Sequence, residues 1–540
     1  MPSSYKFPSH IFVLLGLWIF VTFFNLDKAF HIDDNHHMDF AQWIAANPLR
    51  PMSGLIYANG DWYPIFWTNQ PSLFFFLMAG WSFLFGWSEL SMHSLMAIFS
   101  LFAILAFYQI CKTVIPQYAL FGTSALALSV AFVTGQNMMV DIPLLAMQLG
   151  FYAIALKSAK KSHLDYLLLG ILCAAAVLMK YTSLILLPAL ILLVFLERDW
   201  KKIFYLLIPL GALALWSLWN FLEFGHIHIL SRNPSIKSWF TPIRFTFWWI
   251  GILGAISPFA IYVFYQTLSS AKNSNHPKKE WLWRFFLFGS LISYGLVIIS
   301  LFIPLPDATT NLIFNFSFLV TGFGLLGIII LQAKNLRKSK ISKQQVMLYY
   351  WLISSFLFII VLTPFMAMRH VLLALPAVIL LSIQAMILDS AFQSRYAQHV
   401  KTFVIVLSIS ITSLLASADY WFAQIARQQA SEIVKQLPSN ETIWYTGHWG
   451  WVWYATVAGM SAWDQKKSRV QVGDYFVLNQ HATKPCCLEL TLLKTIPIEY
   501  SSWYQHFATT GLYASDMRPW QYSVKPINTY WIYQVSSIHP

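Results

Sequence analysis

The acidic residues that follow the first apolar run are the first in the chain whose types and spacing could support chemistry. Asp33, Asp34 and Asp39 fall within seven positions, in a chain with only 22 Asp and Glu among its 540 residues. A carboxylate at a membrane surface can act as a general base on an acceptor hydroxyl. The alternative is a solvated acidic loop in which Asp33 or Asp34 caps the helix that begins here.

A further carboxylate, Asp141, lies between two apolar runs. An acid at mid-bilayer would cost roughly 2.5–3.5 kcal/mol, so acids in such places usually have a function. The alternative is that Asp141 caps the following helix, with Pro143 in its first turn. The residues alone leave both interpretations open.

Several cations lie at the ends of apolar runs or in the loop 224–243, on the side of the membrane that these acids share. They are Lys180, Arg369 with its neighbour His370, Arg244, Arg232 and Lys237. Such groups could hold a phosphate, Arg through two parallel hydrogen bonds and Lys as a point charge. The alternative is that each side chain extends to lipid headgroups.

A divalent metal is a third possibility for the acidic segment. His36 and His37 could bind one together with Asp33, Asp34 or Asp39, but the spacing matches no strong metal-binding motif. We therefore expect no required cofactor.

The elements that position these residues are predicted to be membrane-spanning helices. Of the 540 residues, 57% are hydrophobic and 11% are charged, whereas a soluble domain carries roughly 25% charged residues. Fourteen apolar runs lie between residues 10 and 418. This composition excludes a soluble enzyme, a disordered chain and a disulfide scaffold, and it predicts a multi-pass α-helical membrane protein.

The basic loops predict the topology. Lys and Arg gather at 157–163, 198–202, 271–284 and 334–343, which indicates cytoplasmic loops rather than a nucleic-acid surface. The short run 71–86 begins with Pro71 and is expected to lie in the outer interface as a juxtamembrane helix. The prediction is then about 13 spans, with the N-terminus cytoplasmic and the segment 30–91 outside.

The composition changes after residue 418 and becomes mixed α/β. Residues 420–437 have helical spacing, and 442–446, 475–478 and 529–535 have the character of strands. We therefore predict two domains, a transmembrane domain over 1–418 and a small external α/β domain over 419–540.

The order of these motifs resembles a known family. The Asp33-Asp34 loop, Asn69-Gln70-Pro71, Asp141 opening a span, Lys180 closing another and Arg369-His370 follow in sequence. This order is similar to that of GT-C fold glycosyltransferases that use polyprenyl-phosphate sugars. The bacterial branch of protein O-mannosyltransferases and of the aminoarabinose transferase of lipid A is the most similar. Asn69-Gln70-Pro71 departs from relatives that often carry charged or His residues there, which weakens any inference of bound zinc.

The resemblance implies roles for the site residues. Asp33, Asp34 and Asp141 would be the catalytic acids, and Lys180, Arg369, His370 and Arg244 would bind the phosphate of the donor. The sugar would move, with inversion, to a hydroxyl of a periplasmic lipid A, glycan or protein acceptor.

The resemblance also implies a place in the cell, the bacterial inner membrane, with the tail in the periplasm. Two alternatives remain open at this point. One is a flippase or transporter of lipid-linked sugars, and the other is a polysaccharide ligase with a pyrophosphate donor.

Overall fold

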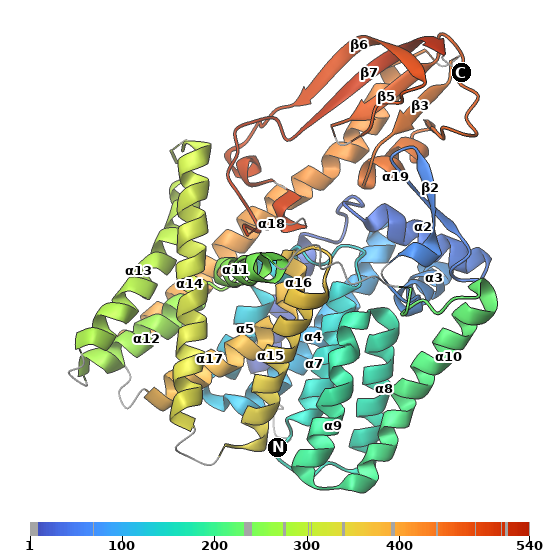
Figure 1. Ribbon diagram of the computed structural model, residues 1–540. Coiled ribbons are helices and arrows are strands. Elements are labelled where there is room, and N and C mark those ends of the chain that lie inside the picture. The colour runs from blue at the N-terminus through green and yellow to red at the C-terminus, as the bar shows by residue number, and fades with distance from the viewer. Residues whose placement is uncertain are drawn as a thin grey trace, which may run out of the picture.

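The computed structural model describes residues 9–538, apart from 69, 232–239, 274–276, 301, 304, 337–340, 390–394, 439–440, 481, 509 and 514–516. The predictions for Asn69, Arg232 and Lys237 therefore lie outside the described residues. Helices fill most of the chain up to residue 436, and a β-sheet near the C-terminus covers one end of them (Figure 1).

The helices before the sheet are α1 (Ser9–Phe23), α2 (Asp34–Ala46), α3 (Leu73–Phe85), α4 (Glu89–Val114), α5 (Ala119–Ala127), α6 (Val130–Val133), α7 (Asp141–Ala155), α8 (His163–Met179), α9 (Leu186–Glu197), α10 (Leu207–Phe224), α11 (Phe240–Ala255), α12 (Ala260–Asn273), α13 (Pro277–Ile299), α14 (Asp307–Leu336), α15 (Lys343–Leu362), α16 (Met368–Leu372), α17 (Leu375–Asp389) and α18 (Ala397–Gln436).

Several of these helices are long and apolar enough to cross a membrane. Six such segments occur within the described residues: Glu89–Val114, Trp200–Phe224, Lys279–Ile299, Asp307–Asn335, Lys343–Leu362 and Ala397–Gln436. A seventh arises if α11 and α12, bent by 86°, form one broken span. A membrane protein is thus supported, and the larger number of about 13 spans stays a prediction.

Two expected spans are not continuous helices. The run 244–266 bends between α11 and α12 at Pro258, because proline lacks a backbone N–H and disfavours helical geometry in the residue before it. The run 117–135 breaks between α5 and α6, where the Thr412 hydroxyl of α18 donates to the Leu128 carbonyl oxygen over 2.8 Å or less, at 2.7 Å. A side chain from another helix thereby satisfies a backbone group released by the break.

The expected juxtamembrane helix corresponds to α3, which begins two residues after Pro71 and ends at Gly86. Gly86 has a φ of 76°, a value that favours glycine and stops the helix.

Glycines let α11 and α14 approach closely. A Cβ on Gly254 would lie 1.9 Å from the Phe318 carbonyl oxygen, and one on Gly322 would lie 2.0 Å from that of Ile250. Small residues at helix interfaces in membranes allow this kind of backbone contact.

The C-terminal region contains a five-stranded sheet. Its strands are β3 (Ile443–Thr446), β4 (Ser461–Ala462), β5 (Tyr475–Asn479), β6 (Leu488–Ile498) and β7 (Asn528–Ile538), in the order β4-β3-β5-β7-β6. β3 pairs in parallel with β4 and β5, and β7 pairs antiparallel with β5 and β6. The short helix α19 (Gly450–Val457) follows β3.

The sheet is attached to the helices at several points. α18 runs from the helical part to the base of the sheet as one 40-residue helix, so the predicted boundary at 418 falls inside it (Figure 1). The hairpin of β1 (Leu55–Ala58) and β2 (Asp61–Pro64) docks on the sheet, where Asn59 N–H donates to the Gly447 carbonyl oxygen at 2.9 Å. The division into two domains therefore stays a prediction.

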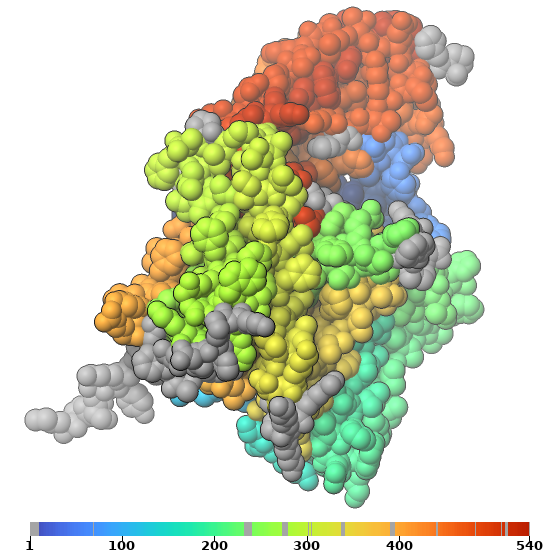
Figure 2. Space-filling model, turned by 60° about the vertical axis from the view of Figure 1, so that its left-hand side comes forward, coloured from blue at the N-terminus to red at the C-terminus, as the bar shows by residue number. Residues whose placement is uncertain are grey.

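A third attachment joins the tail to the start of α14. The Asn311 side chain pairs with the backbone of Tyr522, donating to its carbonyl oxygen at 2.9 Å and accepting from its N–H at 3.0 Å. Figure 2 shows the C-terminal region seated on the end of α13 and α14.

Candidate active site

Asp141 is the centre of a buried group of charges. It is the first residue of α7, and its side chain makes no capping hydrogen bond. Instead Lys180 Nζ lies 2.7 Å from its Oδ1, and Arg369 Nε lies 3.5 Å from its Oδ2. The carboxylate is only 3% exposed, so the two cations supply the charge balance that burial requires. The geometry favours the functional interpretation of Asp141 over the capping one.

Lys180 and Arg369 reach Asp141 because both lie where helices break. Lys180 has extended backbone geometry directly after α8, and Arg369 lies in the five-residue helix α16. The Arg369 guanidinium lies 5.4 Å from the centre of the Phe365 ring, a cation–π contact that helps fix its plane.

Asp33 joins the same group through Arg369, whose Nη2 lies 3.7 Å from Asp33 Oδ2. Asp33 occupies the N-cap position of α2 but makes no side-chain capping bond. Its side chain is 38% exposed, against 12% for Arg369. We call Asp33, Asp141, Lys180 and Arg369 the carboxylate–cation cluster. Within it, Asp33 is the acid open to solvent.

The residue before Asp33 has an unusual backbone. Ile32 is buried and has a φ of 52°, a region that β-branched residues rarely enter. Such a conformation costs about 1–3 kcal/mol and persists only where the surroundings enforce it. The turn that presents Asp33 is therefore held in place by its neighbours.

Asp34 points away from the carboxylate–cation cluster. Its side chain is buried, and its Oδ2 accepts a hydrogen bond from the His31 N–H at 2.7 Å. Burial raises the pKa of the Asp34 carboxyl to about 7. Burial also lowers the pKa of His31 to about 4. Asp34 thus closes the turn around Asp33, and its predicted contact with the acceptor has no support in this geometry.

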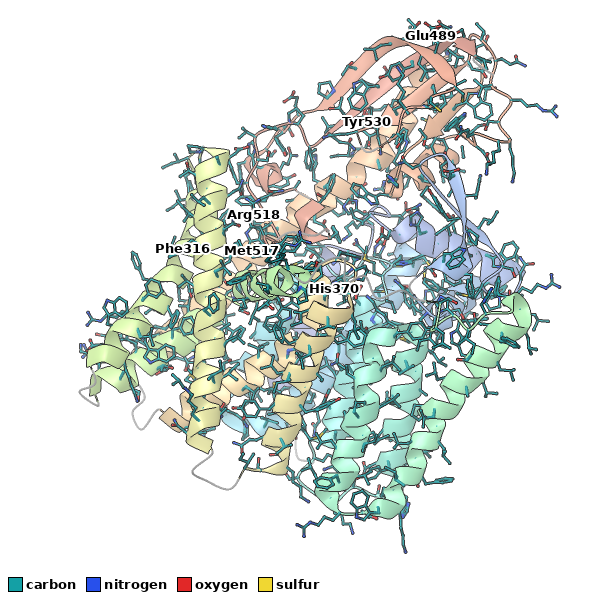
Figure 3. The ribbon with its side chains drawn as sticks, viewed as in Figure 1. Phe316, His370, Glu489, Met517, Arg518 and Tyr530 are labelled. Atoms are coloured by element: carbon teal, nitrogen blue, oxygen red, sulfur yellow. The ribbon has the colours of Figure 1, made fainter. Side chains whose placement is uncertain are left out.

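Two of the predicted phosphate-binding residues differ from the expectation. His370 is buried, and its Nδ1 accepts from the Ala367 N–H at 3.2 Å, so its ring is neutral with the proton on Nε2. Arg244 is exposed on α11 and lies over the Trp248 ring at 4.9 Å. Within the described residues no ion pair links Arg244 to the carboxylate–cation cluster. Figure 3 places His370 near the middle of the molecule, close to Met517 and Arg518 of the C-terminal segment.

The histidines of α2 do not form a ligand set with the acids. His37 Nδ1 lies 2.5 Å from the Met138 carbonyl oxygen, to which it donates. Throughout the described part of the chain, no group of three or more His, Cys, Asp or Glu could hold a metal ion. That the reaction needs no metal stays a prediction.

Sequence reasoning did not identify a second buried ion pair near Asp33. Lys28 Nζ lies 3.0 Å from Asp419 Oδ2, and the two side chains are 1% and 2% exposed. The available signal was weak: each is a lone charge at the outer end of an apolar run, and the two signs are complementary.

The chain was compared with known proteins at this point in the description of the site. Residues 69–220 match the family model described as "Dolichyl-phosphate-mannose-protein mannosyltransferase". No curated protein sequence matches the chain.

Solved structures of similar fold include three glycosyltransferases. The oligosaccharyltransferase AglB of Archaeoglobus fulgidus is 13% identical, with 87% of this chain and 69% of that chain covered and a TM-score of 0.47. ArnT of Cupriavidus metallidurans is 16% identical, with 87% and 92% covered and a TM-score of 0.37. The protein O-mannosyltransferase complex of S. cerevisiae is 17% identical, with 41% and 34% covered and a TM-score of 0.32.

The family match spans α3 to α10 and includes two members of the carboxylate–cation cluster, Asp141 and Lys180. On that match, the chain is a membrane glycosyltransferase of the GT-C fold.

Proposed function

We propose that the protein transfers a sugar from a polyprenyl monophosphate carrier to an acceptor hydroxyl on the outer side of the membrane. The observation that carries the proposal is the carboxylate–cation cluster, in which one guanidinium, that of Arg369, contacts both an exposed acid and a buried one. The matched family is described by a dolichyl-phosphate sugar, which supports a lipid monophosphate donor for this chain.

Each member of the carboxylate–cation cluster has a distinct role in this reaction. Asp33 takes the proton of the acceptor hydroxyl as its oxygen bonds to the anomeric carbon. The bond from that carbon to the phosphate oxygen breaks, and its electron pair leaves with the polyprenyl monophosphate. Lys180 and Arg369 stabilise the charge on this leaving group, and a single displacement inverts the anomeric centre.

Asp141 acts through its neighbours in this scheme. Its carboxylate orients Lys180 and Arg369 and adds negative charge near the sugar ring. In glycosyl transfer the ring carries oxocarbenium character in the transition state, which nearby carboxylates stabilise.

Donor cleavage tests the proposal. Wild-type protein in proteoliposomes, supplied with a polyprenyl monophosphate sugar and envelope lipids, should release polyprenyl monophosphate and form one glycosylated product for each donor consumed. Movement of intact donor across the bilayer would contradict transfer and indicate a flippase. Turnover with a pyrophosphate donor alone would indicate a ligase.

The bacterial inner membrane and the periplasmic orientation of the tail belong to the same proposal. They are supported by the basic loops on one side of the predicted spans and by the acids and cations left on the other.

A further inference from the structure

The buried Lys28–Asp419 pair has no part in the transfer step, yet it lies beside the turn that presents Asp33. Lys28 follows α1, Asp419 lies within α18, and their side chains meet at 3.0 Å. Tyr513 of the C-terminal segment completes the unit, because its hydroxyl donates to the Asp419 carboxylate at 2.8 Å. Three segments far apart in sequence therefore converge on one carboxylate.

The same unit fixes the residues directly before Asp33. The His31 ring packs edge-on against Phe422 of α18 and against Tyr513, with centroids 4.7 and 5.4 Å away. His31 Nε2 lies 3.8 Å from Asp419 Oδ1. The chain from Lys28 to His31 is thus held from the side of α18, and Ile32, with its φ of 52°, follows at once.

The backbone of Phe30 is held from the opposite side by α19. The Phe30 N–H donates to the Tyr454 hydroxyl at 2.9 Å. A Cβ on Gly450 would lie 2.1 Å from the Phe30 carbonyl oxygen, so α19 packs directly on this backbone. The turn before Asp33 is therefore enclosed by α18, α19 and the C-terminal segment.

The Tyr513 hydroxyl also connects this unit to the approach to Asp141. It lies 3.2 Å from the Thr134 carbonyl oxygen, in the segment between α6 and α7. One hydroxyl thereby lies between the turn that carries Asp33 and the segment that leads to Asp141.

A buried ion pair contributes little net stability, because removing both charges from water offsets their attraction. Such pairs are better explained where they fix a geometry. We propose that Lys28 and Asp419 are positioning residues, whose pair, completed by Tyr513, holds the strained Ile32 turn so that the Asp33 carboxylate stays beside Arg369. This inference rests on the proposed function of Asp33.

The chain contains a matched control at a distance from Asp33. Lys161 and Glu197 also form a buried pair, at 2.9 Å with side chains 6% and 5% exposed. A tyrosine completes it too, since the Tyr166 hydroxyl donates to Glu197 at 3.2 Å. Lys161 lies in the loop between α7 and α8, and Glu197 ends α9, so this pair is at the other end of α8 from Lys180.

The test compares charge-free replacements of the two pairs. Lys28→Met/Asp419→Leu and Lys161→Met/Glu197→Leu are reconstituted, and kcat, the donor KM and the melting temperature are measured for each. We expect the first variant to lose about 10- to 100-fold in kcat with donor KM nearly unchanged, because small misplacements of a reacting group reduce rates by that order. The control variant should keep the kcat of the wild type, and both should melt within a few degrees of it.

The single variant Asp419→Asn adds a second readout, since it leaves Lys28 buried without its partner. It should lose both stability and kcat, whereas the double variant should regain only stability. A normal kcat in the folded double variant would overturn the inference, and so would a double variant that cannot fold, because the pair would then be structural. An inactive wild-type protein would instead contradict the proposed function itself.

Discussion

Arg369 is the residue on which the geometry of the candidate site depends, since it contacts Asp33 and Asp141 at once. Arg369→Lys keeps the positive charge but loses the planar fork that can reach two carboxylates. We expect the transfer rate to fall at least about 10-fold, with little change in melting temperature. Steady-state kinetics in proteoliposomes check this, and an unchanged kcat would show that charge alone suffices.

Asp34 provides a prediction for pH dependence. Its carboxyl keeps its proton up to about pH 7 in the folded protein, against 3.8 as its ordinary pKa. Because the folded state binds this proton more tightly, the Asp34 contribution to stability falls as pH rises between these values.

Asp34→Asn cannot titrate and retains an oxygen that can accept from the His31 N–H. Its melting temperature relative to wild type should therefore rise between about pH 4 and about pH 7. The exposed Asp61 of β2 offers a control, because Asp61→Asn should follow the wild-type profile. Parallel profiles for Asp34→Asn and wild type would contradict the assigned pKa shift.

The residue types of the site could be found in the sequence, but their contacts could not. Asp33, Asp141, Lys180 and Arg369 were identified because charges are scarce in this chain. That Asp34 turns away from them depends on the conformation of Ile32, a backbone choice that no local pattern of residues indicates. Arg244 has the expected type and place in the chain, yet its stacking on Trp248 directs it elsewhere.

At the scale of elements, the contact between α11 and α14 is the one that tolerates the least added volume. Gly322→Ala places a methyl group against the Ile250 carbonyl oxygen and should destabilise the protein by about 1–3 kcal/mol. Gly327→Ala on the same helix is the matched control, because its Cβ would meet no atom within 4 Å. Thermal unfolding in detergent compares them, and equal melting temperatures would show that the two helices can separate freely.

Elements were predicted best where hydrophobic spacing was strong. The expected strands at 442–446, 475–478 and 529–535 correspond to β3, β5 and β7. β6 was missed, because most of Leu488–Ile498 is exposed and it includes Pro497, so it lacks an alternating pattern. The helix predicted at 420–437 is the second half of α18, since hydropathy changes along that helix without any residue that would end it.

At the scale of the whole molecule, the acids, the cations and the tail are all proposed to face the outside of the membrane. Cys486 reports on this topology, because it is a free and exposed thiol in the tail, while Cys111 and Cys173 are buried. A membrane-impermeant maleimide should label Cys486 in sealed spheroplasts. Labelling that requires permeabilised membranes would reverse the orientation. Cys486→Ser/Cys487→Ser serves as the control for specificity.

The central claim is that Asp33 is the base that takes the acceptor proton, supported by Asp141 within the carboxylate–cation cluster. The most direct measurement is the rate of sugar transfer by Asp33→Asn and Asp141→Asn in proteoliposomes, with melting temperature as the control for folding. We predict a fall of at least about 100-fold for each variant, with melting temperature retained for Asp33→Asn, whose side chain is partly exposed. Near-normal rates for both variants would contradict the account.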